Sequence, residues 1–415
     1  MKNSEKALAL MGTFAVGLFS AFYFFVPAIF SVDYSSSGEE VATTTHEIAT
    51  STKLLEPEIV VTHIKTPEPL KAIYMSACVA ATPSWRTKLA NLVEITELNA
   101  LVIDVKDYTG TISYYPTNPK LSGGAGIGCR VRDMKKFVAS LHEKGIYVIA
   151  RITVFQDPYY TKAHPELAVK KASDGTVWKD HKGLSFVDVS AKPYWEYIAT
   201  LARDTYAQGF DEINFDYIRF PSDGDMTNIA YPWTEKMAKP IALEKFFAYL
   251  EENVKPSGAA ISADLFGMTT TNNDDLNIGQ VLESALRHFD YVAPMVYPSH
   301  YPPYFNNWKN PNEHLYDVVY YSMVRAVERA RFMVLKTSTT TVALGGNFVK
   351  NTTPPNPGEL KMMLKLRPWL QDFDYGGNYG PAEVRAQIKA TYDTGLTSWM
   401  LWDPANRYTP SALEK

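Results

Sequence analysis

The sequence predicts a (β/α)8 barrel, in which eight parallel strands alternate with helices. Three observations support this prediction. Short apolar segments recur from residue 72 to residue 402, segments with helical periodicity separate most of them, and polar side chains stand at the ends of several apolar segments. Parallel strands that are buried on both faces have this appearance. A doubly wound open sheet is the alternative, but no G-x-G-x-x-G motif follows the first predicted strand.

The predicted elements are bounded by residues that start and stop regular structure. Pro193, Pro240 and Pro381 suit the first turns of helices, and Gly145, Gly209 and Gly395 suit positions just after helix ends. The predicted strands are 72–79, 100–106, 147–152, 212–217, 261–266, 291–297, 366–373 and 397–402. The predicted helices are 84–96, 131–144, 193–208, 240–254, 278–288, 315–336 and 381–392.

Long connecting segments account for the length of the domain. Four of them, 108–129, 155–185, 221–239 and 298–314, directly follow predicted strands. Loops that follow the strands of such a barrel build its mouth, where sites are found. A fifth long segment, 337–365, joins the sixth predicted helix to the seventh strand.

Composition narrows the class of protein. The net charge is −4 and there is no long basic run, so a nucleic-acid partner is not expected. The chain has 26 Tyr, 20 Phe and 8 Trp, a surplus that suits both sugar-stacking surfaces and a core. For the only two cysteines, Cys78 and Cys129, two free thiols are favoured over a single bridge, and a disulfide scaffold is excluded.

The N-terminal part predicts a membrane anchor. Residues 7–30 form a run of 24 positions without a charged residue, lysines precede it and acidic residues follow it. This length and charge pattern predict a signal anchor over residues 1–30 with the rest of the chain outside the cytoplasm. A cleaved signal peptide is the alternative. Residues 31–69 have the composition of a linker, and residues 70–415 form the predicted barrel domain.

The segment 210–225, FDEINFDYIRFPSDGD, is the most informative part of the chain. On a strand Asn214 and Asp216 face one way and Ile213 and Phe215 the other. A carboxylate at the end of a buried strand is costly unless something pairs with it or uses it, and Arg219 is an obvious partner.

Inward-facing polar residues near the other strand ends predict a common site. They come from several strands but from the same end of each, as residues of a barrel active site do. The set is Asp104, Lys106, Asp107, Arg151, Asn214, Asp216, Ser262, Asp264, Tyr297, Gln371, Trp402 and Asp403.

Two carboxyl groups with opposed roles predict glycoside hydrolysis. Asp216 is predicted to be the nucleophile or base, kept ionised by Arg219 or Arg151. Asp264, on the neighbouring strand, is predicted to be the proton donor, because the apolar residues beside it favour its neutral form. The two roles could be exchanged, and Asp104 or Asp107 could replace either residue.

Aromatic and histidine side chains supply further candidates. Trp402, Tyr297, Tyr217 and Phe155 are candidate platforms for sugar rings, and the aromatic tract 297–314 is a candidate mouth loop. His164 and His181 are expected to be ordinary loop residues.

Other chemistries find little support. No H-E-x-x-H, G-x-S-x-G or Walker A sequence occurs. The acidic loop 271–277 lacks the spacing of a calcium loop, so a solvated loop is favoured. No metal or organic cofactor is expected.

Four motifs resemble one known family. They are KAIYMSACVAATPSW, NALVIDVKDYTGTISY, EINFDYIRFPSDG and SWMLWDP, spread over residues 71–405. The family consists of uncharacterised bacterial TIM-barrel proteins classed as glycoside hydrolases, distantly similar to the α-amylase-like clan. The resemblance implies a nucleophile at Asp216. The amylase-like acid is a Glu at the end of the fifth strand, where this chain has Asp264, and the amylase-type His-Asp pair is not evident.

The sequence therefore predicts a membrane-anchored extracytoplasmic glycosidase whose partners are a glycan and, through residues 7–30, a membrane. A glycan-binding envelope barrel without catalysis is the main alternative. A metal-dependent deacetylase, with metal at Asp104, Asp107 or the histidines, is the third.

Overall fold

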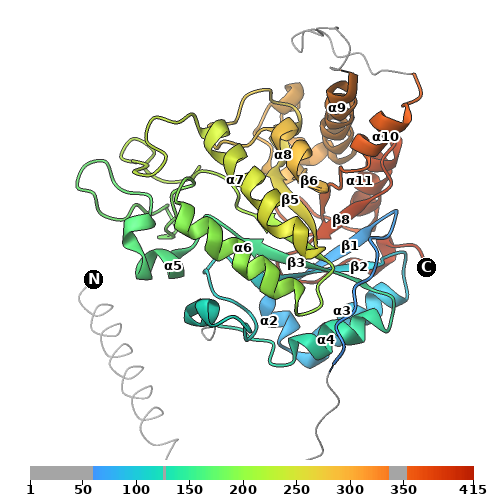
Figure 1. The fold of residues 1–415 in the computed structure, drawn as a ribbon. Helices are drawn as coiled ribbons and strands as arrows, with labels where there is room; N and C mark the ends of the chain where they lie inside the picture. The colour runs from blue at the N-terminus through green and yellow to red at the C-terminus, as the bar shows by residue number, and fades with distance from the viewer. Residues whose placement is uncertain (1–58, 125–127, 336–352) are drawn as a thin grey trace, which may run out of the picture. The chain divides into compact units, whose positions relative to one another are not determined.

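A computed structural model describes residues 59–124, 128–335 and 353–415 of the chain. In this part of the chain eight strands close into a barrel, each parallel to its neighbours in sequence, with β8 returning to β1 (Figure 1). The predicted (β/α)8 barrel is confirmed. The strands are β1 Lys71–Met75, β2 Ala100–Lys106, β3 Tyr147–Thr153, β4 Glu212–Asp216, β5 Ala260–Phe266, β6 Tyr291–Met295, β7 Trp369–Gln371 and β8 Trp399–Trp402.

All seven predicted helices are present, with ends that differ by a few residues from the prediction. The α-helices are α2 Ala77–Ala80, α3 Pro83–Glu94, α4 Met134–His142, α5 Pro158–Ala163, α6 Lys192–Tyr206, α7 Lys239–Val254, α8 Leu282–His288, α9 Leu315–Leu335, α10 Pro357–Met363 and α11 Pro381–Asp393. The 3-10 helices are η1 Pro119–Gly124, η2 Pro165–Leu167, η3 Lys255–Ser257, η4 Gly267–Thr270, η5 Pro298–His300, η6 Phe305–Asn307, η7 Pro311–Glu313 and η8 Pro410–Ala412.

Three short α-helices, α2, α5 and α10, were not predicted. The case of α2 is instructive, because its residues were assigned to the end of the first strand. Ser76 ends the strand by accepting a hydrogen bond from the backbone N–H of Val79 at 3.4 Å, which starts a helix instead. An apolar run cannot distinguish a long strand from a short strand followed by a helical turn.

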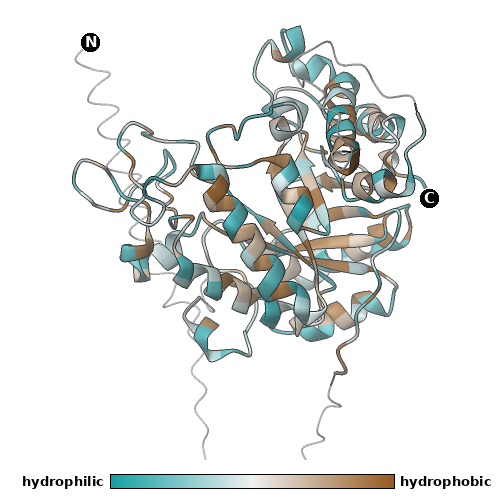
Figure 2. Cartoon of the chain, turned by 45° about the horizontal axis from the view of Figure 1, so that its top comes forward, coloured by the Kyte–Doolittle hydropathy of each residue, from teal (hydrophilic) through white to brown (hydrophobic). Residues whose placement is uncertain are grey.

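The apolar side chains form two concentric layers. Figure 2 shows hydrophobic strands in the centre and helices whose outward faces are hydrophilic. Ile213 and Phe215 point outward into the layer between strands and helices, whereas Tyr147 and Trp369 belong to the cluster inside the barrel. The inward-facing positions of each strand are therefore a limited set, and most positions near the carboxyl ends of the strands are polar.

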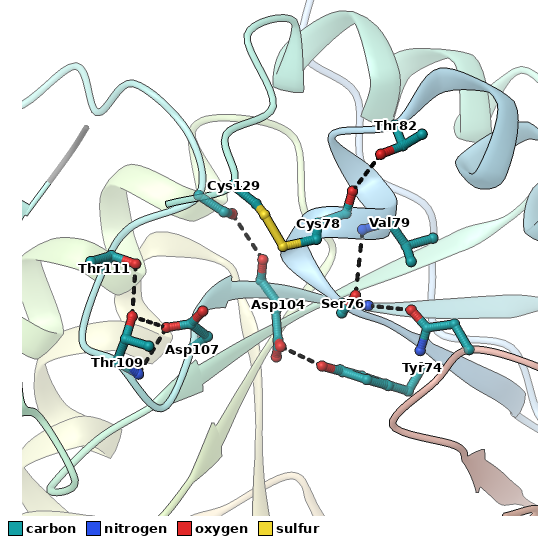
Figure 3. The surroundings of a disulfide bond; sticks show 12 residues. Tyr74, Ser76, Cys78, Val79, Thr82, Asp104, Asp107, Thr109, Thr111 and Cys129 are labelled. Atoms are coloured by element: carbon teal, nitrogen blue, oxygen red, sulfur yellow. Dashed lines mark hydrogen bonds between the residues drawn. A yellow bond between two sulfur atoms is a disulfide. The ribbon is translucent and has the colours of Figure 1, made fainter. Parts of the chain in front are cut away.

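The two cysteines form a disulfide, so the prediction of two free thiols is wrong. Cys78 lies in α2, after β1, and Cys129 lies in the segment after β2 (Figure 3). The two are 51 positions apart in sequence. They meet because β1 and β2 are parallel neighbours, which brings the segments after both strands to the same end of the barrel.

The predicted anchor and most of the predicted linker lie outside the described residues. Within the described ranges no helix is both long enough and apolar enough to cross a membrane. The last part of the predicted linker, residues 59–69, lies against the barrel. The backbone N–H of Ile64 donates to Asp211 at 2.6 Å, and Thr66 hydrogen-bonds Tyr147 at 2.9 Å.

An ion pair occupies the interior of the barrel near the amino ends of its strands. Arg367 donates to Glu212 at 3.0 Å, and both side chains are only 2% exposed. Tyr147 donates to the same carboxylate at 3.1 Å. Removing one member of a buried pair leaves an uncompensated charge, which costs about 3–5 kcal/mol.

We expect Arg367→Met to lower the free energy of unfolding by about 3–5 kcal/mol, because Glu212 would remain buried and unpaired. Urea denaturation measures this change. Arg287→Met is the matched control, since Arg287 pairs with Glu244 at 2.6 Å on the surface and should cost less than about 1 kcal/mol. Equal losses in the two variants would contradict the role of the buried pair.

Candidate active site

The strand register brings four polar residues side by side across the barrel. Asp104 on β2 is opposite Arg151 on β3, which is opposite Asn214 on β4, which is opposite Ser262 on β5. Asp216 and Asp264 follow two residues after Asn214 and Ser262, so they face the same interior one step nearer the mouth.

Arg151 connects three carboxyl groups. Its Nη1 donates to Asp104 at 2.6 Å, and its Nη2 and Nε donate to Asp216 Oδ2 at 2.5 and 3.1 Å. Asp264 Oδ2 is 4.0 Å from Nε. Burial lowers the pKa of Arg151, but the carboxylates of Asp104 and Asp216 outweigh burial and raise the pKa above its ordinary value. The guanidinium therefore stays charged and fixes the positions of its partners.

Aromatic side chains pack beside the Arg151 guanidinium. Its Cζ lies 5.0 Å from the ring centre of Trp402, which stacks on Tyr74 at 3.9 Å. The Tyr74 hydroxyl donates to Asp104 Oδ2 at 2.5 Å (Figure 3). Asp104 is consequently bound on both oxygens, one by Arg151 and one by Tyr74.

The strand after Asp216 ends in an unusual turn. Tyr217 has φ of +51°, the left-handed region that an aromatic residue adopts only at a cost of about 1–2 kcal/mol. This conformation lets the Tyr217 N–H donate to Asp216 Oδ1 at 2.6 Å. Arg151 occupies Oδ2 with two donors, so Oδ1 is the less heavily bonded oxygen.

Asp264 has a different environment. Its Oδ1 accepts hydrogen bonds from Asn214 Nδ2 and Trp369 Nε1, both at 2.9 Å. Both donors meet the same oxygen, so a proton on this carboxyl belongs on Oδ2. That is the oxygen on the side of Arg151 and Asp216.

Burial raises the pKa of Asp264 to about 8, and the negative charge of Asp216 adds to this effect. Arg151 and the hydrogen bonds from Asn214 and Trp369 oppose it without cancelling it. Asp264 is therefore mostly protonated at neutral pH, while its neighbour Asp216 is bound to a cation.

The two carboxyl groups are close enough to act on one bond. Asp216 Oδ2 is 3.1 Å and Asp264 Oδ2 is 4.0 Å from the same Arg151 Nε. The distance between the two Oδ2 atoms therefore cannot exceed the sum of these two distances. Carboxyl pairs of glycosidases are about 5–9.5 Å apart.

The two carboxyls open onto a cavity of about 330 Å³, within the size range of small-molecule sites. Its wall combines charged groups with aromatic and thioether side chains. The lining residues are Arg151, Asp216, Tyr217, Arg219, Asp264, Phe266, Gly267, Met268, Met295, Tyr297, His300, Tyr301 and Trp402.

Seven of the predicted site residues line this cavity, namely Arg151, Asp216, Tyr217, Arg219, Asp264, Tyr297 and Trp402. Asp104 and Asn214 do not line it. They lie behind the lining residues and hold Arg151 and Asp264 in place. Arg219 lines the cavity but is not the partner of Asp216, which pairs with Arg151.

Lys106 does not reach the cavity, contrary to expectation. The register between β2 and β3 shifts between Asp104 and Lys106, so Lys106 is opposite the outward-facing Ile152. Such an irregularity redirects the side chains that follow it. Lys106 is fully buried, and its Nζ lies 2.9 Å from Asp157 and 2.6 Å from the carbonyl of Thr153.

Three other predicted binding residues have structural partners instead. Asp107 accepts from the backbone and hydroxyl of Thr109, and Asp403 accepts from the N–H groups of Ala405 and Arg407. Gln371 is buried and accepts from Ser299 at 2.9 Å. None of the three lines the cavity.

Phe155 and two histidines were further candidates from the sequence. Phe155 is fully buried against Phe246, so it is no sugar platform. His164 and His181 are exposed loop residues, 3.4 Å from Glu166 and 3.7 Å from Asp223, respectively. In the described ranges no three His, Cys, Asp or Glu residues are arranged to hold a metal.

Several residues that line the cavity or hold its carboxyl groups were not predicted. Trp369 shares a strand face with Gln371, so the alternation that singled out Gln371 also pointed to it. Phe266, Gly267 and Met268 directly follow Asp264, and position alone marked them as mouth residues. Nothing in the sequence indicated that Tyr74 belongs to the site, because a tyrosine in an apolar strand is expected in the hydrophobic core.

Comparisons with known proteins identify the family. Residues 72–341 and 347–408 match the family described as "Putative glycosyl hydrolase domain", and the chain belongs to this family. The resemblance inferred from the sequence motifs is confirmed. No curated protein matches the chain.

Solved structures resemble the chain, and one of them, with a TM-score of 0.57, shares its fold. A hypothetical protein from Ruminiclostridium thermocellum ATCC 27405 is 30% identical over 46% of this chain and 96% of its own, with a TM-score of 0.42. The PgaB (BpsB) glycoside hydrolase domain from Bordetella bronchiseptica is 12% identical over 84% of this chain and 99% of its own, with a TM-score of 0.57. A maltogenic α-amylase from Thermotoga neapolitana is 15% identical over 64% and 55%, with a TM-score of 0.37.

We expect Asp264 to titrate near pH 8 in a ¹³C NMR titration of its carboxyl group. Asp216→Asn should lower its pKa, because a repelling negative charge is removed. Trp369→Phe should raise it further, because the lost indole N–H stabilises the ionised form. Trp399→Phe is the control, since its indole donates to Tyr392 and should leave Asp264 unchanged.

The raised pKa of Asp264 also affects the stability of the folded protein. It is raised above the unfolded value of about 3.9, so this carboxyl contributes stability that is complete below about pH 4 and is lost as pH rises through about 8. Asp264→Asn should remove that part of the pH dependence. A titration of Asp264 near pH 4 would contradict both expectations.

Proposed function

We propose that this protein is a glycosidase in which Asp264 donates the proton and Asp216 acts as nucleophile or base. The observation that carries the proposal is the contrast between two neighbouring carboxyls in one cavity. Arg151 binds Asp216 and favours its ionised form. Burial favours the protonated form of Asp264. Glycoside hydrolysis requires this pair of opposite states.

The geometry suggests which oxygen performs each step. Asp264 Oδ2 carries the proton and transfers it to the glycosidic oxygen as the bond to the anomeric carbon breaks. Asp216 Oδ1, free of Arg151, attacks the anomeric carbon or takes a proton from the water that attacks it. Trp402 and Tyr297 supply apolar surfaces on which a sugar ring can stack.

A substrate series tests the two roles separately. The full-length chain is assayed on aryl glycosides with good and poor leaving groups and on a panel of envelope and storage glycans. Asp264→Asn should lose about 10³-fold in rate on poor leaving groups and far less on 2,4-dinitrophenyl glycosides, which leave without protonation. Asp216→Asn should lose activity on both.

Asn214→Ala and Gln371→Ala serve as paired comparisons in the same assay. The first removes a hydrogen bond to Asp264 and should shift the basic limb of the pH profile. The second removes the contacts of Gln371 to Ser299 and to the carbonyl of Phe373 and leaves the hydrogen bonds of Asp264 in place. Retention or inversion at the anomeric carbon, followed by ¹H NMR, decides between attack by Asp216 and attack by water. Glycan binding without hydrolysis in wild type would favour the non-catalytic envelope barrel.

We further propose that the domain is extracytoplasmic and anchored by residues 7–30. The charge-free run supports the anchor, and the Cys78–Cys129 disulfide supports an oxidising compartment. In cells, the full chain should sediment with membranes and resist extraction at high salt and alkaline pH. Added protease should digest the domain once the outer barriers of the cell are opened, while the inner membrane is still intact. Digestion only after the inner membrane is broken would show the reverse topology.

A further inference from the structure

Arg219 is a buried cation that has no carboxylate partner among the residues that the structure describes. It lies in the loop after β4 and is 9% exposed. The described part of the chain buries four other arginines, and each has a carboxylate within 4.0 Å. These are Arg151 with Asp216, Arg329 with Glu283, Arg331 with Glu359 and Arg367 with Glu212. A buried charge without a partner is costly, so its retention calls for an explanation.

The contacts of Arg219 leave part of its guanidinium unused. Nη1 donates to the carbonyl of Phe220 at 3.0 Å and to Ser222 at 3.1 Å. Across the residues that the structure describes, no acceptor meets the donors on Nε and Nη2. A guanidinium presents such donors as a planar fork that fits the two oxygens of an anionic group.

Aromatic rings hold the guanidinium in place. Its Cζ lies 4.8 Å from the ring centre of Phe266 and 5.0 Å from that of Tyr217. These contacts compensate part of the charge through the ring faces, but they leave the in-plane donors free. Burial lowers the pKa of Arg219, and the nearby charges of Asp216, Asp180 and Asp223 oppose this effect only in part.

Arg219 stands between two cavities. It lines the cavity that holds Asp216 and Asp264, and it also lines a second cavity of about 350 Å³, which includes Tyr108, Gln156 and Lys182. Tyr217 is the other residue common to both. A glycan that passes from one cavity to the other must therefore cross the donors of Arg219.

Acidic residues of the second cavity do not occupy these donors. Asp180 Oδ1 accepts from the N–H groups of Lys182 and Leu184, and Asp223 lies 3.7 Å from His181. Neither carboxylate is within 4.0 Å of Arg219. Since no carboxylate among the described residues pairs with Arg219, an external anion could supply the partner.

We propose that Arg219 binds an oxyanion carried by the glycan, so that the substrate is an acidic polysaccharide with a carboxylate, sulfate or phosphate group at the junction of the two cavities. This inference rests on the proposed glycosidase function. It adds the chemical class of the substrate and a recognition residue that is separate from the two reacting carboxyls.

The test uses the full-length chain with ¹⁵N-labelled arginine and follows the Nε–H signal of Arg219 by NMR. The probes are glucuronate, glucose 6-sulfate and glucose 6-phosphate, with glucose as the neutral control. At least one anionic sugar should shift the signal to saturation, with an affinity about 10–100-fold above that of glucose, as expected for a charge-assisted pair. The response to the three anions identifies which group the site accepts.

Two variants give the comparison. Arg219→Gln should abolish the preference for the anionic sugar, whereas Arg130→Gln should retain it, because Arg130 lies over the ring of Tyr115 outside both cavities. The thermal midpoint of Arg219→Gln should be equal to or above that of wild type, since an unpaired buried charge is removed. A clear fall would indicate a structural role and overturn the inference.

The readout does not depend on catalysis, so the two proposals can fail separately. Saturable anion binding at Arg219 without hydrolysis of any glycan would keep the inference and reject the glycosidase. Hydrolysis of neutral glycans at equal rates by wild type and Arg219→Gln, with no anion preference in the NMR titration, would keep the glycosidase and reject the inference.

Discussion

The ion-pair cluster around Arg151 is the interaction on which the mouth of the barrel depends. One guanidinium from β3 binds Asp104 on β2 and Asp216 on β4 and approaches Asp264 on β5. Carboxylates this close together and this deeply buried would otherwise repel one another and take up protons. Arg151 thus sets the positions of these side chains.

The asymmetry of Asp216 and Asp264 follows from how each is bonded. Asp216 receives three donors, two of them charged. Asp264 receives two neutral donors on one oxygen, and no described residue donates to the other. Burial therefore raises the pKa of Asp264, while Asp216 in the same cavity is held in an ion pair with Arg151. Arg219 shows the opposite situation at the cavity edge, where a buried cation has donors that no described residue accepts.

Periodicity in the sequence was sufficient for the fold and for much of the site. All eight strands and seven helices follow from apolar runs and their punctuation. Alternation along β4 and β5 correctly directed Asp216 and Asp264 to the interior, because a strand allows only two faces. It failed for Lys106, where a shift in register with β3 redirects the side chain, since no local residue pattern encodes that shift.

The sequence by itself determined which residues belong to the barrel, which ends of the strands are polar and which family the chain resembles. These properties depend on local periodicity and on motifs. Only the tertiary structure decided which side chains form ion pairs and whether the two cysteines are bonded. It paired Asp216 with Arg151 instead of Arg219, and it joined Cys78 to Cys129. Pairings of this kind depend on distances between segments far apart in the chain, and closure of the barrel sets those distances.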